Sequence, residues 1–139
     1  MPSTTAITHV ESREPAIDAN REAAVDFLMR SAAGGAPAAM RKYASDGFVH
    51  HNPFFASDGA TLAEGMDANA RQNPEKVLTV QRTVAEGPLV VVHSKVHHRP
   101  HDRPAATVHI FRFEDGRIAE LWDVGQEEPE DSPNQAGMF

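Results

Sequence analysis

Residues 105–126, AATVHIFRFEDGRIAELWDVGQ, decide the fold of this chain. Residues 107–113 alternate in polarity and are rich in β-branched and aromatic side chains, and residues 118–124 do so more loosely. Asp115-Gly116 lies between the two runs, and glycine tolerates the positive φ that a tight two-residue turn requires. The stretch therefore predicts an antiparallel hairpin with Asp115 and Gly116 in its turn.

The turn also predicts which residues of the hairpin lie opposite each other. Glu114 then pairs with Arg117, and the period of two carries this register outward along both strands. One face is expected to carry His109, Phe111, Phe113, Ile118, Glu120 and Trp122, with Phe111 opposite Glu120 and His109 opposite Trp122. The other face is expected to carry Val108, Ile110, Arg112, Ala119, Leu121 and Asp123. A face that mixes aromatic groups with a histidine and a carboxylate is typical of a half-apolar pocket wall; the alternative is a solvent face with a few aromatics.

The bulk composition limits the partners. A chain of 139 residues is long enough for one domain with a real core. Its net charge of -7 and pI near 5.5 argue against nucleic acid or an anionic membrane as the main partner. No run has the length of a transmembrane helix, the N-terminus lacks a signal-peptide pattern, and cysteine is absent. The expected location is cytoplasmic.

Three helices are expected before the strands. Residues 1–14 have no periodicity and are expected to form a flexible arm. A first helix should start near Pro15 and end at Gly34-Gly35, and a second should run from Pro37 to about Tyr43. Residues 48–50 are expected to be extended, and Pro53 excludes a helix through the residue before it. A third helix, capped at or just after Asp58, should end before Pro74.

The remaining sequence predicts strands. Residues 77–84 and 89–98 are strand-like and are separated by a Glu-Gly-Pro turn signal, and the hairpin follows. The fold class is therefore α+β, with three helices packed on a curved antiparallel sheet of about four main strands. Residues 15–126 form the single domain. The tail, residues 127–139, ends in the apolar Gly-Met-Phe group and either docks as a pocket lid or is disordered.

Histidine is the best candidate for chemistry, because His51, His93 and His109 come from separate segments and two of them interrupt apolar strands. One interpretation is acid–base catalysis beside Glu120 or Asp123, since neighbouring groups can tune a histidine pKa. A metal site is the second, although no local ligand motif is present. The third is structural histidines in a core or at a sheet edge.

Other polar and aromatic residues receive weaker assignments. His97, His98 and His101 lie at a strand end and in a charged loop, so they are expected to be solvated and outside the site. Trp122 is more often a core residue, but opposite His109 it could form a wall on which a flat substrate stacks.

The order of these elements, with His51-Asn52-Pro53 between the helices, FRFEDGRIAELWDV at residues 111–124 and Gly-Met-Phe at the end, resembles the SnoaL-like polyketide cyclases. That family belongs to the nuclear-transport-factor-like superfamily of cone-shaped α+β barrels. The branch of SnoaL-like aldol-condensation-catalysing proteins is the most similar, with a tyrosine-containing helix, here with Tyr43, before the His-Asn-Pro segment. The resemblance covers about residues 15–139.

The resemblance implies a deep pocket between the concave sheet face and the helices, no cofactor, and a homodimer through the outer sheet face. In the cyclases a carboxylate near the end of the last strand takes a proton from an acidic carbon. Asp123 is the nearest match, but the expected register places it opposite to Trp122 and Glu120. Either a bulge turns Asp123 inward or Glu120 is the pocket carboxylate.

Together these observations predict a homodimeric enzyme without a cofactor, acting on a small, largely apolar carbonyl compound by aldol cyclisation, isomerisation or dehydration. The candidate proton carriers are His51 and His109, with Glu120 or Asp123 as the partner. The candidate substrate-binding residues are Asn52, as donor to the enolate oxygen, and His93, Phe111, Phe113 and Trp122. A non-catalytic ligand-binding homodimer, and an enzyme with a metal held by histidines, are the alternatives.

Overall fold

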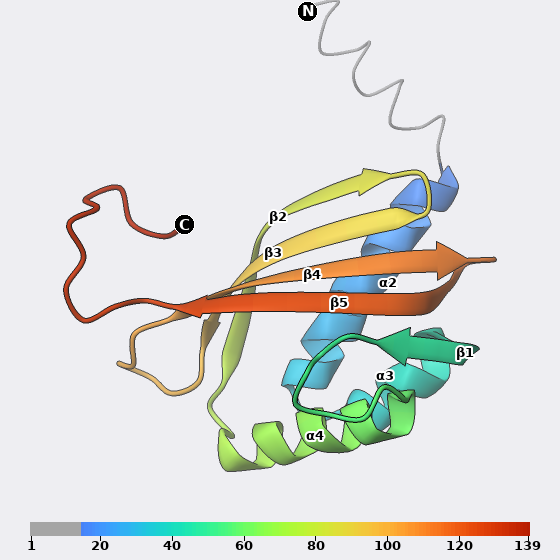
Figure 1. Cartoon of the computed structure of the whole chain (residues 1–139), viewed down its shortest axis with the longest axis horizontal. Helices are drawn as coiled ribbons and strands as arrows, with labels where there is room; N and C mark the ends of the chain where they lie inside the picture. Colours follow the sequence, from blue (N-terminus) through green and yellow to red (C-terminus); the bar gives the residue numbers. More distant parts are fainter. Residues whose placement is uncertain (1–14) are drawn as a thin grey trace, which may run out of the picture.

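The computed structural model describes residues 15–139, which form three helices and one five-stranded sheet (Figure 1). The predicted arm at residues 1–14 lies outside the described residues. The helices are α2 (Pro15–Ala32), α3 (Ala36–Tyr43) and α4 (Gly59–Gln72). The strands are β1 (Ala44–His50), β2 (Val77–Glu86), β3 (Leu89–His97), β4 (Ala105–Glu114) and β5 (Arg117–Glu127). None of the helices in this part of the chain is long and apolar enough to cross a membrane.

The three predicted helices are confirmed, and local chemistry explains their limits. Asp58 caps α4 by accepting hydrogen bonds from the Thr61 backbone N–H at 2.8 Å and the Thr61 hydroxyl at 2.7 Å. Pro37 lies at the start of α3, where a missing N–H costs no hydrogen bond. Gly34, at φ 92°, adopts the left-handed conformation that ends α2.

The sheet has five strands in the order β1-β5-β4-β3-β2, instead of about four. The four predicted strands form the antiparallel meander, as expected. The addition is β1, which pairs in parallel with β5 and makes the sheet mixed and open. Its sequence, ASDGFVH, has little strand character before Phe48, so only the pairing with β5 extends it back to Ala44.

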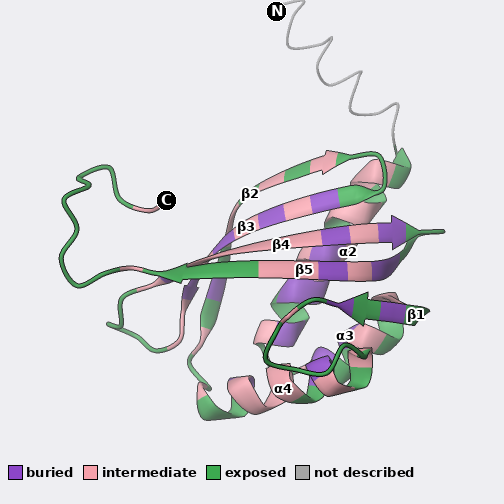
Figure 2. Cartoon of the chain, in the orientation of Figure 1, coloured by how far each residue is buried: buried purple, intermediate pink, exposed green. Residues whose placement is uncertain are grey.

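The core lies between the inner face of the sheet and the helices (Figure 2). Phe27 of α2 packs edge-on against Phe111 of β4, with ring centroids 5.8 Å apart, and both are fully buried. From β3, Val90, Val92 and Val96 point to the same side. Figure 1 shows α2 crossing behind the sheet and α4 below it, so that the helices and the inner sheet face enclose one apolar layer.

Candidate functional site

The β4–β5 hairpin has the predicted turn, but its register changes beyond the first two pairs. Asp115 and Gly116 both have positive φ, and Glu114 pairs with Arg117. A bulge then follows, so that Arg112 lies opposite Glu120 and His109 opposite Asp123. The predicted pairs of Phe111 with Glu120 and of His109 with Trp122 are therefore wrong.

Because of the bulge, every later residue of β5 lies on the face opposite to the predicted one. Ala119 is the extra residue, and Ile118 and Ala119 are both buried. After it, Leu121 and Asp123 share the inner face with His109, while Glu120 and Trp122 share the outer face with Arg112. Of the two options that the sequence left open, the bulge that turns Asp123 inward is the one present.

A cavity of about 300 Å³ lies between the inner sheet face and helices α2 and α4. Its apolar lining consists of Phe27, Leu28, Ala32, Phe55, Leu62, Gly65, Met66, Leu78, Val96 and Leu121. Its polar lining consists of Ser31, Asn52, Asn69, Lys76, His98, Thr107, His109 and Asp123. A more open groove beside Pro53 and Phe54 shares four residues with the cavity and connects them to the surface: Asn52, Thr107, His109 and Asp123.

Asp123 is held in place by the loop that follows β1. The Asn52 side-chain amide donates a 2.9 Å hydrogen bond to Asp123 Oδ2. Asn52 is itself fixed, because its Oδ1 accepts from the Phe54 backbone N–H at 3.0 Å. The other carboxylate oxygen of Asp123 makes no hydrogen bond with the described residues, so one lone-pair face of the carboxylate stays available to a ligand.

His109 is a neutral imidazole at the cavity wall. Burial lowers its pKa to about 4, the charge of Lys76 acts in the same direction, and Asp123 opposes both. Its Nδ1 is buried without a partner among the described residues, and Nε2 makes no hydrogen bond with them either. A neutral imidazole beside a carboxylate can donate a hydrogen bond to a ligand or relay a proton.

Five polar residues of the cavity lie outside the predicted site: Ser31, Asn69, Lys76, His98 and Thr107. Lys76 Nζ donates a 2.8 Å hydrogen bond to Asn69 Oδ1, and burial lowers the pKa of Lys76. His98, expected to be solvated, lines the cavity, and its pKa is lowered by burial and by Lys76. Strand alternation could have indicated both residues, because Lys76 is two residues before buried Leu78 and His98 two after buried Val96.

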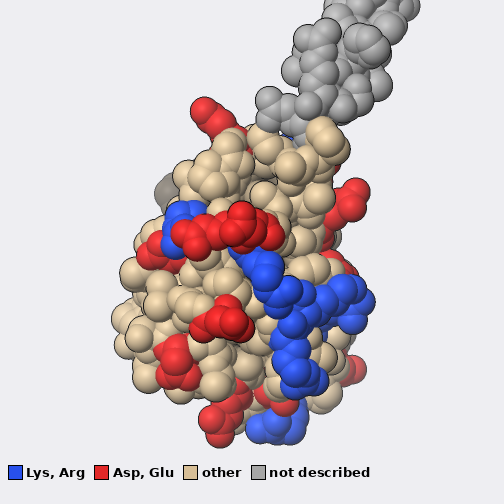
Figure 3. Space-filling view, turned by 90° about the vertical axis from the view of Figure 1, so that its right-hand side faces the viewer, with Lys and Arg blue, Asp and Glu red and all other residues tan. Residues whose placement is uncertain are grey.

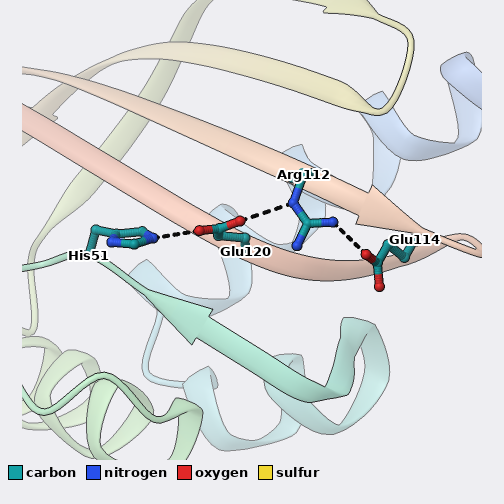
Figure 4. A network of polar contacts seen from close by, with 4 residues as sticks. All are labelled: His51, Arg112, Glu114 and Glu120. Carbon is teal, nitrogen blue, oxygen red and sulfur yellow. Dashed lines mark hydrogen bonds and ion pairs between the residues drawn. The ribbon is translucent and has the colours of Figure 1, made fainter.

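The predicted proton carrier His51 lies on the other face of the sheet. His51 Nε2 is 2.6 Å from Glu120 Oε2, and Glu120 Oε1 accepts from Arg112 Nε at 3.0 Å (Figure 4). Arg112 Nη1 also donates to Glu114 at 2.6 Å. These contacts lower the pKa of Glu120, first through His51 and then through Arg112. His51 and Glu120 therefore form a pair on the outer face, and the structure does not bring them together with His109.

The aromatic candidates also divide between the two faces. Trp122 stacks on the His51 ring, with centroids 5.1 Å apart and planes at 7°, so it forms no wall of the cavity. Phe111 and Phe113 lie on the predicted inner face, but both are buried in the packed core and neither lines the cavity. Of the predicted binding residues, the cavity contains Asn52.

His93 lies on the outer face, where it contacts the C-terminal tail. Arg82 Nη1 hydrogen-bonds its Nδ1, and the Phe139 ring stacks 6.1 Å from the His93 ring. Lys95 Nζ lies 5.0 Å from the centroid of the Phe139 ring. The sequence left a pocket lid and a disordered tail as alternatives; in the structure the end of the tail contacts the sheet face opposite to the cavity.

The three histidines considered for a metal site do not converge. His51 and His93 are on the outer face and His109 is on the inner face. Within residues 15–139, no group of three or more histidine, aspartate or glutamate side chains has the arrangement of a metal site. These three residues therefore form no shared ligand set.

A larger groove, of about 740 Å³, lies between α3, β1 and α4. Two of its three arginines are already engaged: Arg71 pairs with Asp67 at 3.3 Å, and Arg117 donates to the backbone oxygens of Ala44 and Arg41. The side of the molecule seen in Figure 3 carries a band of basic side chains with acidic groups beside it. No histidine of the described residues lines this groove, so the cavity is the better candidate for acid–base chemistry.

Comparison with known proteins gives the family context of this site. The family model described as SnoaL-like domain matches residues 24–121, which include β1, His109 and the first five residues of β5 but end before Asp123. No curated protein matches the chain in sequence.

Solved structures share the fold at low sequence identity. A protein from Jannaschia sp. CCS1, provisionally named a SnoaL-like polyketide cyclase, is 15% identical with a TM-score of 0.67, covering 80% of this chain and 88% of its own. One from Kribbella flavida, provisionally named a ketosteroid isomerase, is 19% identical with a TM-score of 0.64, covering 86% of each chain. An NTF-2 like protein of unknown function from Burkholderia xenovorans is 19% identical with a TM-score of 0.63, covering 84% and 89%.

Proposed function

This chain belongs to the SnoaL-like domain family, and from that premise we propose that it is an enzyme that moves a proton at a carbon next to a carbonyl group. The reaction takes place in the inner cavity, needs no cofactor, and leads to isomerisation, cyclisation or dehydration of a small carbonyl compound. The observation that carries this proposal is the Asn52-bound carboxylate of Asp123, directly opposite neutral His109 in a largely apolar cavity.

Asp123 is the proposed general base. An ionised carboxylate takes the proton from the carbon, and the electron pair of the broken C–H bond moves onto the carbonyl oxygen to give an enolate. The hydrogen bond from Asn52 at 2.9 Å fixes one oxygen of Asp123, so that the other faces the substrate. Positioning of this kind lowers the entropic cost of reaching the transition state, because the base is already oriented.

His109 is the proposed hydrogen-bond donor to the enolate oxygen. Because its pKa is about 4, the His109 ring is neutral at pH 7. It therefore forms no ion pair with Asp123 that would weaken this carboxylate as a base. A neutral imidazole can stabilise the oxygen by donating one N–H, and in the low dielectric of the cavity this contact is stronger than in water. The proton on Asp123 then returns to another carbon of the substrate, or the enolate attacks a second carbonyl.

Proton exchange tests this function without knowledge of the natural substrate. The cyclic ketone 4-oxocyclohexanecarboxamide is incubated in D₂O, and loss of the hydrogens next to its carbonyl is followed by NMR. We expect wild-type protein to accelerate the exchange and Asp123→Asn to reduce the acceleration by about 10²- to 10⁴-fold, the usual contribution of a general base.

The matched control is Asp46→Asn, which changes a carboxylate in the groove between α3, β1 and α4. It should exchange the probe at the wild-type rate. Probe binding without accelerated exchange in the wild type would favour a ligand-binding protein and sink the enzyme proposal. Homodimerisation through the outer sheet face stays a prediction from the family resemblance.

A further inference from the structure

Lys76 supplies the only positive charge that the cavity lining holds at neutral pH, as far as the described residues go. The lining includes one carboxylate, Asp123, and two histidines, His98 and His109, whose pKa values are both lowered. Lys76 precedes β2 and alternates with buried Leu78, so its side chain shares the inner face with the cavity.

The ammonium group of Lys76 has no acidic partner. No carboxylate of residues 15–139 lies within 4 Å of Lys76 Nζ. By contrast, the basic side chains of Lys42, Arg71 and Arg112 each form an ion pair with a carboxylate. Nζ has three donors, and one of them is used, in the bond to Asn69. A half-buried cation without a counter-charge is costly, because burial removes part of its hydration and no negative charge compensates for the loss.

Two hydroxyl groups of the cavity lining also lack partners. Ser31 Oγ from α2 and Thr107 Oγ1 from β4 are buried with no hydrogen bond to the described residues, and both residues line the cavity. Buried polar atoms in folded proteins are nearly always paired. A hydroxyl can turn towards the cavity by rotation about χ1, so the two residues can serve as adjustable donors to a polar ligand.

A purely structural role explains less of this arrangement. Lys76 follows α4 by four residues, and a lysine there could bind the last carbonyl groups of the helix. Its contact is instead with the side chain of Asn69, while the Asn73 side chain binds the Asn69 carbonyl at 2.9 Å. The Asn69 carbonyl is therefore bound without Lys76, and Lys76 Nζ makes no hydrogen bond to a carbonyl of α4, so its charge is left for another partner.

We propose that Lys76 and Asn69 form a subsite that binds the carboxylate of the substrate, so that the substrate is a keto acid or another carbonyl compound with one negative charge. One ammonium group beside an amide, in a cavity that is also lined by two hydroxyl groups, matches a single carboxylate, which accepts hydrogen bonds from several directions. The assignment of the carbonyl end to Asp123 and His109 rests on the proposed function; the anion subsite does not.

The subsite would position the substrate as well as bind it. Lys76 and Asp123 both line a cavity of about 300 Å³, the lower end of the size range of small-molecule pockets. A substrate anchored by its carboxylate at Lys76 is kept in one orientation, and the negative charge of Asp123 repels the reverse orientation. The carbonyl end is then the end that faces the base.

The test compares two probes of the same shape and different charge, 4-oxocyclohexanecarboxylate and 4-oxocyclohexanecarboxamide. Their dissociation constants are measured by isothermal titration calorimetry for wild-type protein, Lys76→Met, Lys76→Arg and the control Lys42→Met. Lys42 is an exposed lysine of α3 that pairs with Asp26. Exchange at the carbon next to the ketone is followed by NMR on the same samples.

We expect wild-type protein and Lys42→Met to bind the carboxylate about tenfold more tightly than the amide, which equals about 1.4 kcal/mol. Lys76→Met should bind the two probes equally, and Lys76→Arg should keep most of the preference because it keeps the charge. Equal binding of the probes by the wild type, no binding of the carboxylate, or a preference that survives in Lys76→Met would each overturn the subsite.

The two proposals fail in different ways. A preference for the carboxylate that depends on Lys76, without accelerated exchange, leaves the subsite standing and removes the catalytic function. The opposite result is exchange that Asp123→Asn abolishes, at rates that are the same for the carboxylate and the amide in both wild type and Lys76→Met. It would support the catalytic function and refute the subsite.

Discussion

Replacing His109 with glutamine should make the protein less sensitive to acid. The pKa of His109 is lowered from 6.5 to about 4 in the folded protein, chiefly by burial. Below pH 6.5 the unfolded chain therefore gains a proton at this position, while the folded protein gains none until the pH approaches 4. Protonation of the unfolded state favours unfolding, so His109 makes the protein lose stability as the pH falls through this window.

The magnitude follows from the two pKa values. At pH 7.5 both states are almost entirely neutral at His109, and its contribution to the pH dependence is close to zero. At pH 5 the unfolded histidine is almost fully protonated and the folded one is about one-tenth protonated, which costs about 2 kcal/mol of unfolding free energy. This cost changes little if the folded pKa is somewhat higher or lower than 4, because the protonation of the unfolded state dominates it.

The assay is urea unfolding at pH 7.5 and pH 5.0, with the free energy of unfolding taken from the midpoint and slope. Between the two pH values, wild-type protein should lose about 2 kcal/mol more than His109→Gln, whose amide does not titrate. His97→Gln, at the end of β3, is the control for the loss of a histidine elsewhere in the sheet. An identical pH dependence in wild type and His109→Gln would refute the assignment of His109 as a buried neutral imidazole.

Two further predictions concern the wall of the cavity and the outer face. In Gly65→Ala the new Cβ would overlap the Phe55 ring, so the ring must leave the cavity wall. We expect a lower thermal midpoint and weaker binding of 4-oxocyclohexanecarboxamide. The control Gly47→Ala, with open space around the new Cβ, should change neither. His51→Ala should leave deuterium exchange of the same probe at the wild-type rate, because His51 contacts Glu120 and Trp122 outside the cavity; a loss as large as that of Asp123→Asn would place the chemistry on the outer face.

The local elements could be predicted because their signals are short-range. Asp115-Gly116 specifies the turn through its positive φ values, and Asp58 specifies the start of α4 through its hydrogen bonds to Thr61. The strand predicted at residues 89–98 is confirmed as β3, whose run of valines favours a strand, although its first four residues are all apolar and do not show which side is buried. Each signal acts between residues that are close in sequence, and tertiary contacts reinforce it.

The candidate site could be predicted only in part, because one extra residue changed the faces of β5. A period of two means that the bulge at Ala119 moves Glu120 and Trp122 to the outer face and Leu121 and Asp123 to the inner face. The sequence contains a trace of it, since the apolar Ile118 and Leu121 are three residues apart, a spacing at which regular alternation cannot bury both, and the structure buries both. Burial of Leu121 in place of a charged Glu120 is the physical reason for the bulge.

By itself, then, the sequence determined the helices, the meander, the hairpin turn and the presence of acid–base residues in apolar strands. The tertiary structure alone decided the parallel pairing of β1 with β5, which places His51 on the outer face and Asn52 against Asp123. It also gathered Lys76, His98 and His109 around one cavity from three separate strand regions. These placements depend on contacts between residues far apart in the chain, 71 positions for Asn52 and Asp123, and neighbouring residues carry no signal for such contacts.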